Sequence, residues 1–492
     1  MLDHTASNHG LKSLAGIAST AELLVEVRAL RSHVSAQGRE IFETLCVGDE
    51  HTNDAALDNL SHYLALRHTD IADLQRRLQA FGLSSLGRSE AKVLTTLDAI
   101  IATLERLTAV PASPYPGLTA MQEADVALRA SRDRLFGGQD DDPYTRIMAT
   151  LPTDAATDPR IVRDLMKAGV TCARINCAHD NPAVWQEMVV NVRIAERELD
   201  RPCRVMMDIA GPKVRVAEVV DPDNKRLKRG DTLMLASNLG SAGKSSVTFT
   251  CSVPHVVDRL SLGDQIWIND GRLGAQVLAR TGGNALLEVI AARVKGERLK
   301  PEKGVNIPGI ELHLPAIGRE DLPVLDFIAE NADLVGFSFV QTRDDIRTLQ
   351  EHLRDRRGAL PPMPIVLKIE TRQAVAGLPG LIAQAASGNP TAVMIARGDL
   401  AVELGFERLS EMQEEMLWLC EAAHVPVVWA TQVLDNLVKD GLPSRAEITD
   451  AAMGQRAECI MLNKGPYLIE GVAFLRRVLQ RMDRHQAKKF AR

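Results

Sequence analysis

Two short stretches in the second half of the chain carry the residues best suited to chemistry. The first, VMIARGDLAVE (393–403), is an apolar run that stops in a glycine turn with Asp399 at its tip. The second, IVLKIE (365–370), ends in Lys368 and Glu370, which strand alternation places on one face. Two carboxylates beside a fixed cation are the groups that metal-assisted phosphoryl transfer requires. The spacing therefore predicts a divalent-metal site with a lysine next to it.

Polar side chains also follow or end three other apolar runs of the sequence. These residues are Arg174, Asn176, Asp208 and Thr431. Each alone is weak evidence, because a charged residue at the end of a strand is often only solvated. The convergence of so many of them on one edge of a sheet favours a functional site.

The roles of these residues follow from their charge. Glu370 and Asp399 would hold Mg²⁺ or Mn²⁺ through hard oxygen ligands. Lys368 and Arg174 would neutralise the oxygens of a transferring phosphoryl group. Gly398 lies in a turn that opens a helix, where backbone N–H groups can receive a substrate carboxylate.

Eight short apolar runs, alternating with helix-like segments, would bring these residues together. They occupy residues 146–151, 172–177, 204–209, 334–340, 365–370, 392–397, 426–431 and 459–463. This alternation predicts an α/β fold with a parallel sheet, and eight repeats favour a closed TIM (β/α)8 barrel over an open sheet. The site would then lie at the carboxyl ends of the strands.

Two further segments interrupt or precede this series, and 492 residues suit two to four domains. Residues 1–140 form an all-α N-terminal extension, in which 56–81 reads as one helical run. We interpret the extension as a bundle that packs on the barrel, with a regulatory or partner-binding role as the alternative. Residues 216–303 predict a small inserted β-barrel, either a lid or a decorative insertion, which leaves 141–215 and 304–492 for the barrel.

Composition excludes several classes of function. The net charge is −6 and only 4% of residues are aromatic, which argues against nucleic-acid binding. No apolar run is long enough to span a membrane, and no signal peptide is visible, so we expect a cytoplasmic protein. The seven cysteines are scattered along the sequence, which predicts that they are reduced thiols.

From Tyr144 to Ile469 the sequence resembles the pyruvate kinase family. The matching segments, in order, are TRIMATL, GVTCARINCAHD, MDIAGPKVRV, IWINDG, KGVNIPGIELHLPAI, GFSFVQTRDDI, LKIE, MIARGDLAVE, ATQVLDNL and PSRAEITDAA. The resemblance implies a TIM barrel with a β lid after the third strand. It also implies a glycolytic kinase that converts phosphoenolpyruvate and ADP into pyruvate and ATP. Assembly of copies through the barrel is left open, and the family's C-terminal regulatory domain is expected to be absent.

The resemblance also implies roles for single residues. Glu370 and Asp399 match the metal ligands, and Lys368 matches the lysine that stabilises the transferring phosphoryl group. Gly398 and Asp399 match the turn that receives the pyruvate carboxylate, and Thr431 matches the threonine beside the carbon that gains a proton. The arginines that match phosphate-binding positions are Arg174 and Arg215.

The potassium site of the family is altered in this sequence. Asn176 and Asp208 remain, but Ala178, Ile209 and Lys213 replace a serine, a threonine and a glutamate. The lysine could supply the positive charge that K⁺ otherwise brings. The resemblance then implies an enzyme that does not require K⁺.

A second departure follows the eighth strand, where Asn463-Lys464-Gly465-Pro466 replaces the family's Ser-Gly-Glu-Thr. The groups that organise the proton-delivering water are thereby lost. Two alternatives stay open: a metal-dependent lyase or aldolase acting on pyruvate or oxaloacetate, and a catalytically silent member of the family.

Overall fold

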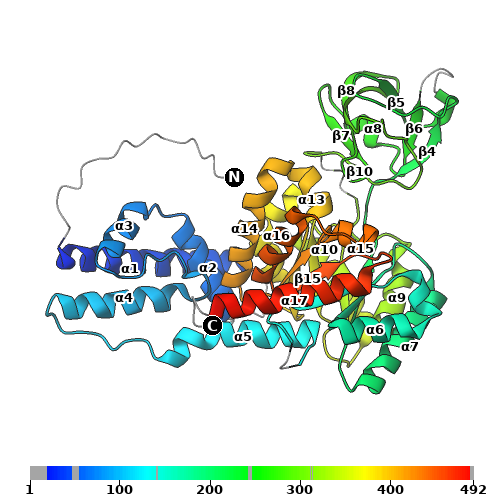
Figure 1. The fold of residues 1–492 in the computed structure, drawn as a ribbon. Helices are drawn as coiled ribbons and strands as arrows, with labels where there is room; N and C mark the ends of the chain where they lie inside the picture. The colour runs from blue at the N-terminus through cyan, green and yellow to red at the C-terminus, as the bar shows by residue number, and fades with distance from the viewer. Residues whose placement is uncertain are drawn as a thin grey trace.

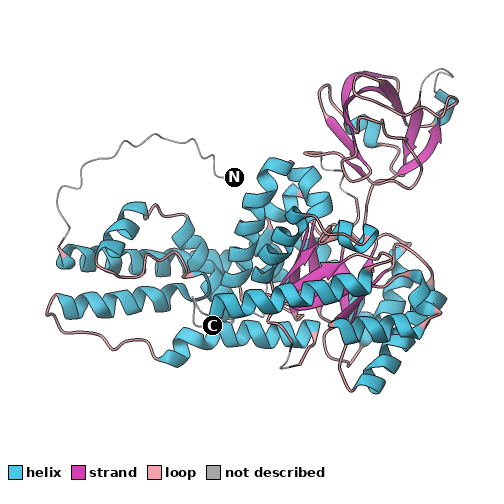
Figure 2. Cartoon of the chain, in the orientation of Figure 1, coloured by secondary structure: helices cyan, strands magenta, loops and turns pink. Residues whose placement is uncertain are grey.

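The computed structural model describes residues 19–46, 55–139, 142–241, 247–310, 312 and 314–487. They form N-terminal helices, a central barrel and a β domain at one end of the barrel (Figure 1; Figure 2). The boundary predicted between residues 140 and 141 lies outside the described residues, as do both predicted chain ends. None of the described helices combines the length and the apolar character needed to cross a membrane.

The central domain is a closed barrel of eight parallel strands within the described part of the chain. Around the barrel the order is β1-β15-β14-β13-β12-β11-β3-β2. The strands are β1 (Arg146–Thr150), β2 (Cys172–Asn176), β3 (Arg204–Ile209), β11 (Leu334–Phe337), β12 (Ile365–Ile369), β13 (Thr391–Ala396), β14 (Val427–Ala430) and β15 (Cys459–Leu462). The predicted fold class is confirmed, because each predicted run overlaps one of these strands.

Helices follow the strands and cover the outside of the barrel (Figure 2). They are α6 (Pro159–Ala168), α7 (Pro182–Leu199), α9 (Asp321–Asn331), α10 (Arg343–Arg357), α11 (Arg372–Ala376), α12 (Leu378–Ala386), α13 (Arg397–Leu404), α14 (Phe406–Ala422), α15 (Asp435–Asp440), α16 (Arg445–Met453) and α17 (Leu468–Ala487). Side chains at their first turns explain several starting points. Asp158 and Asn181 cap α6 and α7, and Thr342 and Ser444 form capping boxes with α10 and α16.

The described part of the chain before the barrel forms five helices, and buried residues of the first four belong to the same hydrophobic core as the outer layer of the barrel. They are α1 (Thr20–Leu45), α2 (Ala55–Arg67), α3 (Ala72–Ala80), α4 (Val93–Leu107) and α5 (Leu118–Phe136), with a short 3-10 turn η1 (Glu90–Lys92). The run 56–81 is two helices and not one: α2 ends at Arg67 and α3 begins at Ala72, whose N–H donates a 3.1 Å hydrogen bond to Asp70 in the break.

The end of α5 closes the amino-terminal mouth of the barrel. Leu135 and Phe136 are fully buried against the inward-facing side chains of the strands, among them Met148, Met206 and Met394. The extension therefore completes the interior of the barrel as well as its outer surface.

The inserted domain is a seven-stranded sheet in the order β10-β7-β8-β9-β5-β6-β4. Its elements are β4 (Val216–Val220), β5 (Thr232–Ala236), β6 (Thr248–Cys251), α8 (Val256–Arg259), β7 (Gln265–Ile268), β8 (Leu273–Thr281), β9 (Asn284–Ala292) and β10 (Val305–Asn306). It has a hydrophobic core of its own, separate from the barrel core. We call this domain the lid. It leaves the barrel after β3, and Figure 1 shows it beyond one end of the barrel.

Candidate active site

The predicted charged residues of strands β2, β3 and β12 meet at the carboxyl-terminal rim of the barrel. The Arg174 guanidinium donates two hydrogen bonds, of 3.0 and 2.6 Å, to Oδ2 of Asp208. Its third contact is a 2.9 Å hydrogen bond to the hydroxyl of Thr150. The Lys368 ammonium lies 3.3 Å from the same Asp208 oxygen. Burial alone would raise the pKa of Asp208, but Arg174 and Lys368 outweigh it and hold that pKa below its usual value.

Lys368 also reaches Glu370, as strand alternation predicts. Its Nζ lies 3.3 Å from Oε1 of Glu370 and donates a 2.7 Å hydrogen bond to the Ser338 hydroxyl. The other Glu370 oxygen accepts a 2.6 Å hydrogen bond from the Phe339 N–H. Although burial acts against the charge of Lys368, Glu370 and Asp208 raise its pKa, so the ammonium stays ionised. Burial, and then repulsion by Asp399, raise the pKa of Glu370.

Asp399 lies where the lid joins the barrel. Its Oδ1 accepts a 2.7 Å hydrogen bond from the Lys213 ammonium, which belongs to the chain that leads into the lid. Asn306, in β10, is 3.4 Å from both Asp399 and Glu403. Burial raises the pKa of Glu403 to about 7, and Asp399 adds to the shift. Lid and rim therefore share a group of charged side chains.

The turn after β13 is built on the turn after β14. The Gly398 N–H donates a 2.7 Å hydrogen bond to Oγ1 of Thr431, a residue held at φ = +67°. Positive φ is uncommon for a β-branched residue and marks local strain. Arg397 holds this geometry, since it donates to the Thr431 carbonyl at 2.7 Å, forms an ion pair with Asp450 and stacks on Trp429.

Arg215 and Asn176 form their hydrogen bonds outside this group, although Asn176 is the strand partner of Asp208. Arg215 donates to the Glu302 carbonyl at 3.1 Å, and Asn176 accepts from the Ala178 N–H at 3.2 Å. Within the described residues, no hydrogen bond or ion pair joins Lys213 to Asn176 or Asp208. The structure thus places Lys213 on Asp399 and not on the other two residues of the altered potassium site.

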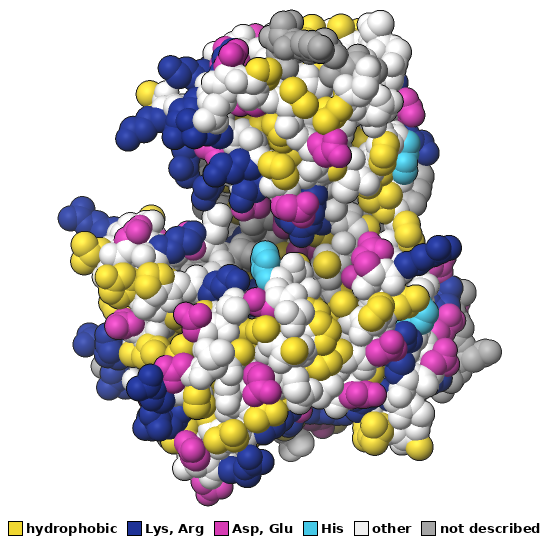
Figure 3. Space-filling model, turned by 90° about the vertical axis from the view of Figure 1, so that its right-hand side faces the viewer, with side chains coloured by type: hydrophobic (Ala, Val, Ile, Leu, Met, Phe, Trp, Pro, Cys, Tyr) yellow, Lys and Arg dark blue, Asp and Glu magenta, His cyan; other side chains and the backbone are white. Residues whose placement is uncertain are grey.

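A second positive group lies near the turn after β2. Burial, and then Lys464, lower the pKa of His179, while Arg215 and Arg174 act in the same direction. Lys464 therefore faces the rim, and the change after the eighth strand adds positive charge to it. Figure 3 shows the hollow between lid and barrel, with lysine and arginine side chains along the edge of the lid.

Four residues of the site were not predicted from the sequence. They are Thr150, Ser338, Asn306 and Glu403. Glu403 is the last residue of the 393–403 stretch, and its carboxylate was the sequence signal that could have identified it. Ser338 and Asn306 gave no such signal, because their contacts depend on the register between strands and on the seating of the lid.

The fold and the rim together define a (β/α)8-barrel protein whose candidate site lies at the strand ends beneath an inserted lid. A family model for the barrel domain of pyruvate kinase matches residues 143–472, and the chain belongs to the pyruvate kinase family. A pyruvate kinase of Agrobacterium vitis is 31% identical over 352 residues, which cover 70% of this chain and 69% of that protein.

A pyruvate kinase of Geobacillus stearothermophilus is 30% identical over 350 residues, or 69% of this chain. The match spans 57% of the length of that relative. Among solved structures, a pyruvate kinase from Cryptosporidium parvum superposes with a TM-score of 0.62 at 27% identity, covering 71% of this chain and 72% of the other. The residues matched by the family model span the eight barrel strands and the lid.

Proposed function

We propose that this protein is a phosphotransferase that converts phosphoenolpyruvate and ADP into pyruvate and ATP. The observation that carries the proposal is the Lys368 ammonium, buried at the rim 3.3 Å from both Asp208 and Glu370. A fixed, ionised cation of this kind stabilises the charge that develops on a transferring phosphoryl group.

In the reaction, the bond between the enol oxygen and phosphorus breaks, and a new bond forms to a terminal phosphate oxygen of ADP. Lys368 and Arg174 neutralise the phosphoryl oxygens during the transfer. The enolate that is left takes a proton at its methylene carbon. Thr431, fixed by its contact with Gly398, stands at the rim to position the donor of this proton.

The carboxylates of the rim fit a divalent metal such as Mg²⁺ or Mn²⁺. Glu370 and Asp399 are close enough for Asp399 to raise the pKa of Glu370. Among the described residues no third acidic, histidine or cysteine ligand completes a closed cage. Mg²⁺ is commonly held by one or two carboxylates, with water and substrate phosphates filling its other positions. When bound, the metal would neutralise charge on the phosphate groups.

We further propose that activity does not require K⁺. The Lys213 ammonium already brings a fixed positive charge to Asp399, at 2.7 Å. A monovalent cation in the same region would only duplicate the positive charge that Lys213 already supplies.

The test is pyruvate formation from phosphoenolpyruvate and ADP with Mg²⁺ or Mn²⁺, in KCl or in tetramethylammonium chloride of equal ionic strength. We expect turnover that differs by less than about twofold between the two salts. Strict dependence on KCl would refute the proposal for Lys213. If the protein showed no turnover with any metal and nucleotide but decarboxylated oxaloacetate, a lyase would be favoured. The specific observation behind this alternative is the altered Asn463–Pro466 segment.

A further inference from the structure

Ser338 is the first residue after β11 and is 2% exposed. Its hydroxyl forms two hydrogen bonds, each of 2.7 Å. It accepts one from the Lys368 ammonium and donates the other to the Ile209 carbonyl. A hydroxyl has a single proton to donate. Because Ser338 gives that proton to a backbone carbonyl, its oxygen meets Lys368 as an acceptor, in a direction that the backbone fixes.

The chain around Ser338 is held from both sides. The chain that leaves β3 passes tightly over it, because a Cβ on Gly211 would lie 2.7 Å from the Ser338 carbonyl oxygen. On the other side, Phe339 has φ = +54° and donates a 2.6 Å hydrogen bond from its N–H to Glu370. A positive φ is uncommon for a bulky residue and persists where the surrounding structure enforces it. The turn therefore presents the Ser338 hydroxyl at a fixed place on the rim.

The contacts of the Lys368 ammonium differ in length. The contact with Ser338 is 2.7 Å, whereas the nearest oxygens of Asp208 and Glu370 are each 3.3 Å away. An ammonium that pairs tightly with a carboxylate lies about 2.7–2.9 Å from it. The serine is therefore the tight partner, and the N–H groups that face the carboxylates are free to turn toward an incoming oxygen. Since the serine is neutral, it holds the lysine without cancelling its charge.

We propose that Ser338 is a positioning residue, which aims the Lys368 ammonium at the transferring phosphoryl group. This inference rests on the phosphotransferase function proposed above. Without the hydroxyl, the ammonium would move toward Asp208 or Glu370 and pair with it more tightly. Its charge would then be withdrawn from the phosphoryl oxygens, which it must reach in the transition state.

The first test is pyruvate formation by Ser338→Ala, compared with the unmodified full chain. We expect kcat to fall roughly tenfold to a hundredfold, because a displacement of about 1 Å in a catalytic group can cost that much. KM for ADP should stay within about twofold, since the lost interaction acts on the transition state. Ser338→Cys keeps the shape of the side chain but offers a weaker acceptor, so it should also lose activity.

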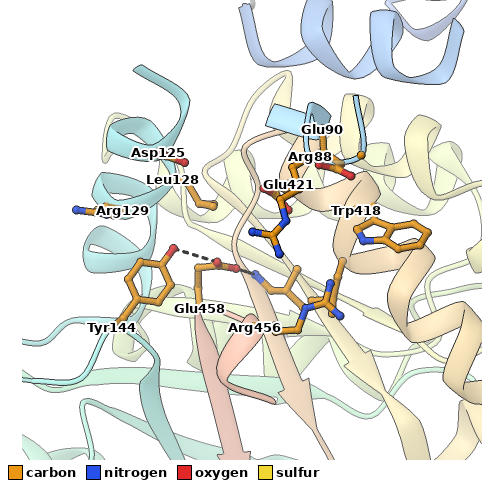
Figure 4. A pocket seen from close by; sticks show the side chains of 13 residues that line it. Arg88, Glu90, Asp125, Leu128, Arg129, Tyr144, Trp418, Glu421, Arg456 and Glu458 are labelled. Carbon is orange, nitrogen blue, oxygen red and sulfur yellow. Dashed lines mark hydrogen bonds between the residues drawn. The ribbon is translucent and has the colours of Figure 1, made fainter. Parts of the chain in front are cut away.

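Tyr144→Phe is the matched control, because it also removes a hydroxyl that contacts a buried ionisable group. The Tyr144 hydroxyl lies 3.3 Å from Glu458. Figure 4 shows this pair, which precedes β1 and β15 and so lies at the end of the barrel opposite to the rim. The turnover of this variant should stay near that of the unmodified protein.

A double-mutant cycle with Lys368→Met separates positioning from a purely structural role. If Ser338 acts through Lys368, adding Ser338→Ala to Lys368→Met should lower kcat by less than about twofold further. The same cycle is measured on the free energy of unfolding in urea, which does not depend on the reaction. There too we expect the two changes to be non-additive, because each removes the same hydrogen bond.

Three results would overturn the proposal. They are full kcat in a folded Ser338→Ala or Ser338→Cys protein, additive effects of the two changes on kcat, and additive effects on unfolding. Failure of the proposed function would look different. The unmodified protein would then form no pyruvate, while the unfolding cycle would still decide whether Ser338 holds Lys368.

Discussion

Lys368 has two carboxylates and a hydroxyl around its ammonium. Replacing it by methionine keeps the length of the side chain but removes the charge. We expect Lys368→Met to lower kcat by roughly 10²–10³, the range for losing a preorganised electrostatic group. Pyruvate formation measures the effect.

Lys439→Met is the matched control, because Lys439 is exposed and pairs only with Asp435. Its turnover should stay near that of the unmodified protein. Circular dichroism must show that Lys368→Met is folded, which we expect since Arg174 still neutralises Asp208. Unchanged kcat in a folded Lys368→Met protein would contradict the role we assign to this residue.

Glu458 gives a prediction about pH. Its pKa is about 7 in the folded protein, whereas an exposed glutamate has a pKa of 4.5. The unfolded chain therefore loses this proton first as the pH rises, and the folded protein loses stability from about pH 4.5 to pH 7. A shift of this size corresponds to about 3 kcal/mol.

Glu458→Gln removes this titration but keeps an oxygen that can accept from Val427. In urea titrations, the free energy of unfolding of the variant minus that of the unmodified protein should increase from pH 5 to pH 8. The same change at the exposed Glu330 serves as the control. A difference that is constant with pH would show that Glu458 does not carry the raised pKa.

At this scale the sequence predicts pairs within one strand better than pairs between strands. Lys368 and Glu370 are two residues apart, so the alternation of a strand was enough to predict their contact. The contact of Ser338 with Lys368 requires the register of β11 against β12, which no local pattern contains. Asn306 required the position of the lid as well.

At the scale of elements, strand β11 approaches β3 so closely that Gly336 has no room for a side chain. A Cβ at this position would lie 2.4 Å from Oδ1 of Asp208. Gly336→Ala must therefore displace the carboxylate that orients Arg174 and Lys368. We expect kcat/KM to fall at least about tenfold, while overpacking costs about 1–3 kcal/mol of stability.

Activity assays and thermal melting separate these two effects. Gly117→Ala is the control, because a Cβ there meets nothing within 4 Å. If Gly336→Ala kept full activity, Asp208 would not be the fixed anchor that the hydrogen bonds indicate.

The eight strands were predicted because each is a short apolar run buried along its length. The helical run 56–81 was less informative, since its apolar spacing continues across the break between Arg67 and Ala72. The break contains Asp70, which accepts a hydrogen bond from the Ala72 N–H, and apolar spacing does not reveal such a local contact. Periodicity shows which residues face a core, and capping decides where an element ends.

At the scale of the whole molecule, the extension and the barrel share their cores. Phe136, at the end of α5, is fully buried among the inner residues of the strands. Phe136→Ala should lower the free energy of unfolding by about 3–5 kcal/mol, the cost of a large cavity in a core. Leu118→Ala, at the other end of the same helix and 81% exposed, should change it by less than about 0.5 kcal/mol.

Urea titration followed by tryptophan fluorescence reports on the barrel, because Trp185 and Trp429 are buried there. If Phe136→Ala left the unfolding reported by this fluorescence unaltered, α5 would not be an integral part of the barrel. The amphipathic helices of the extension did not reveal this arrangement, since an apolar face identifies a buried side but not the surface that buries it.

The separate core of the lid has a consequence for how this chain could change over evolutionary time. The lid contains its own buried residues and joins the barrel through neighbouring chain segments, so it could be replaced, enlarged or lost by recombination without opening the barrel. The extension has no such independence. Its helices would have to be inherited together with the surface they cover, because a barrel that lost them would expose part of its interior to water.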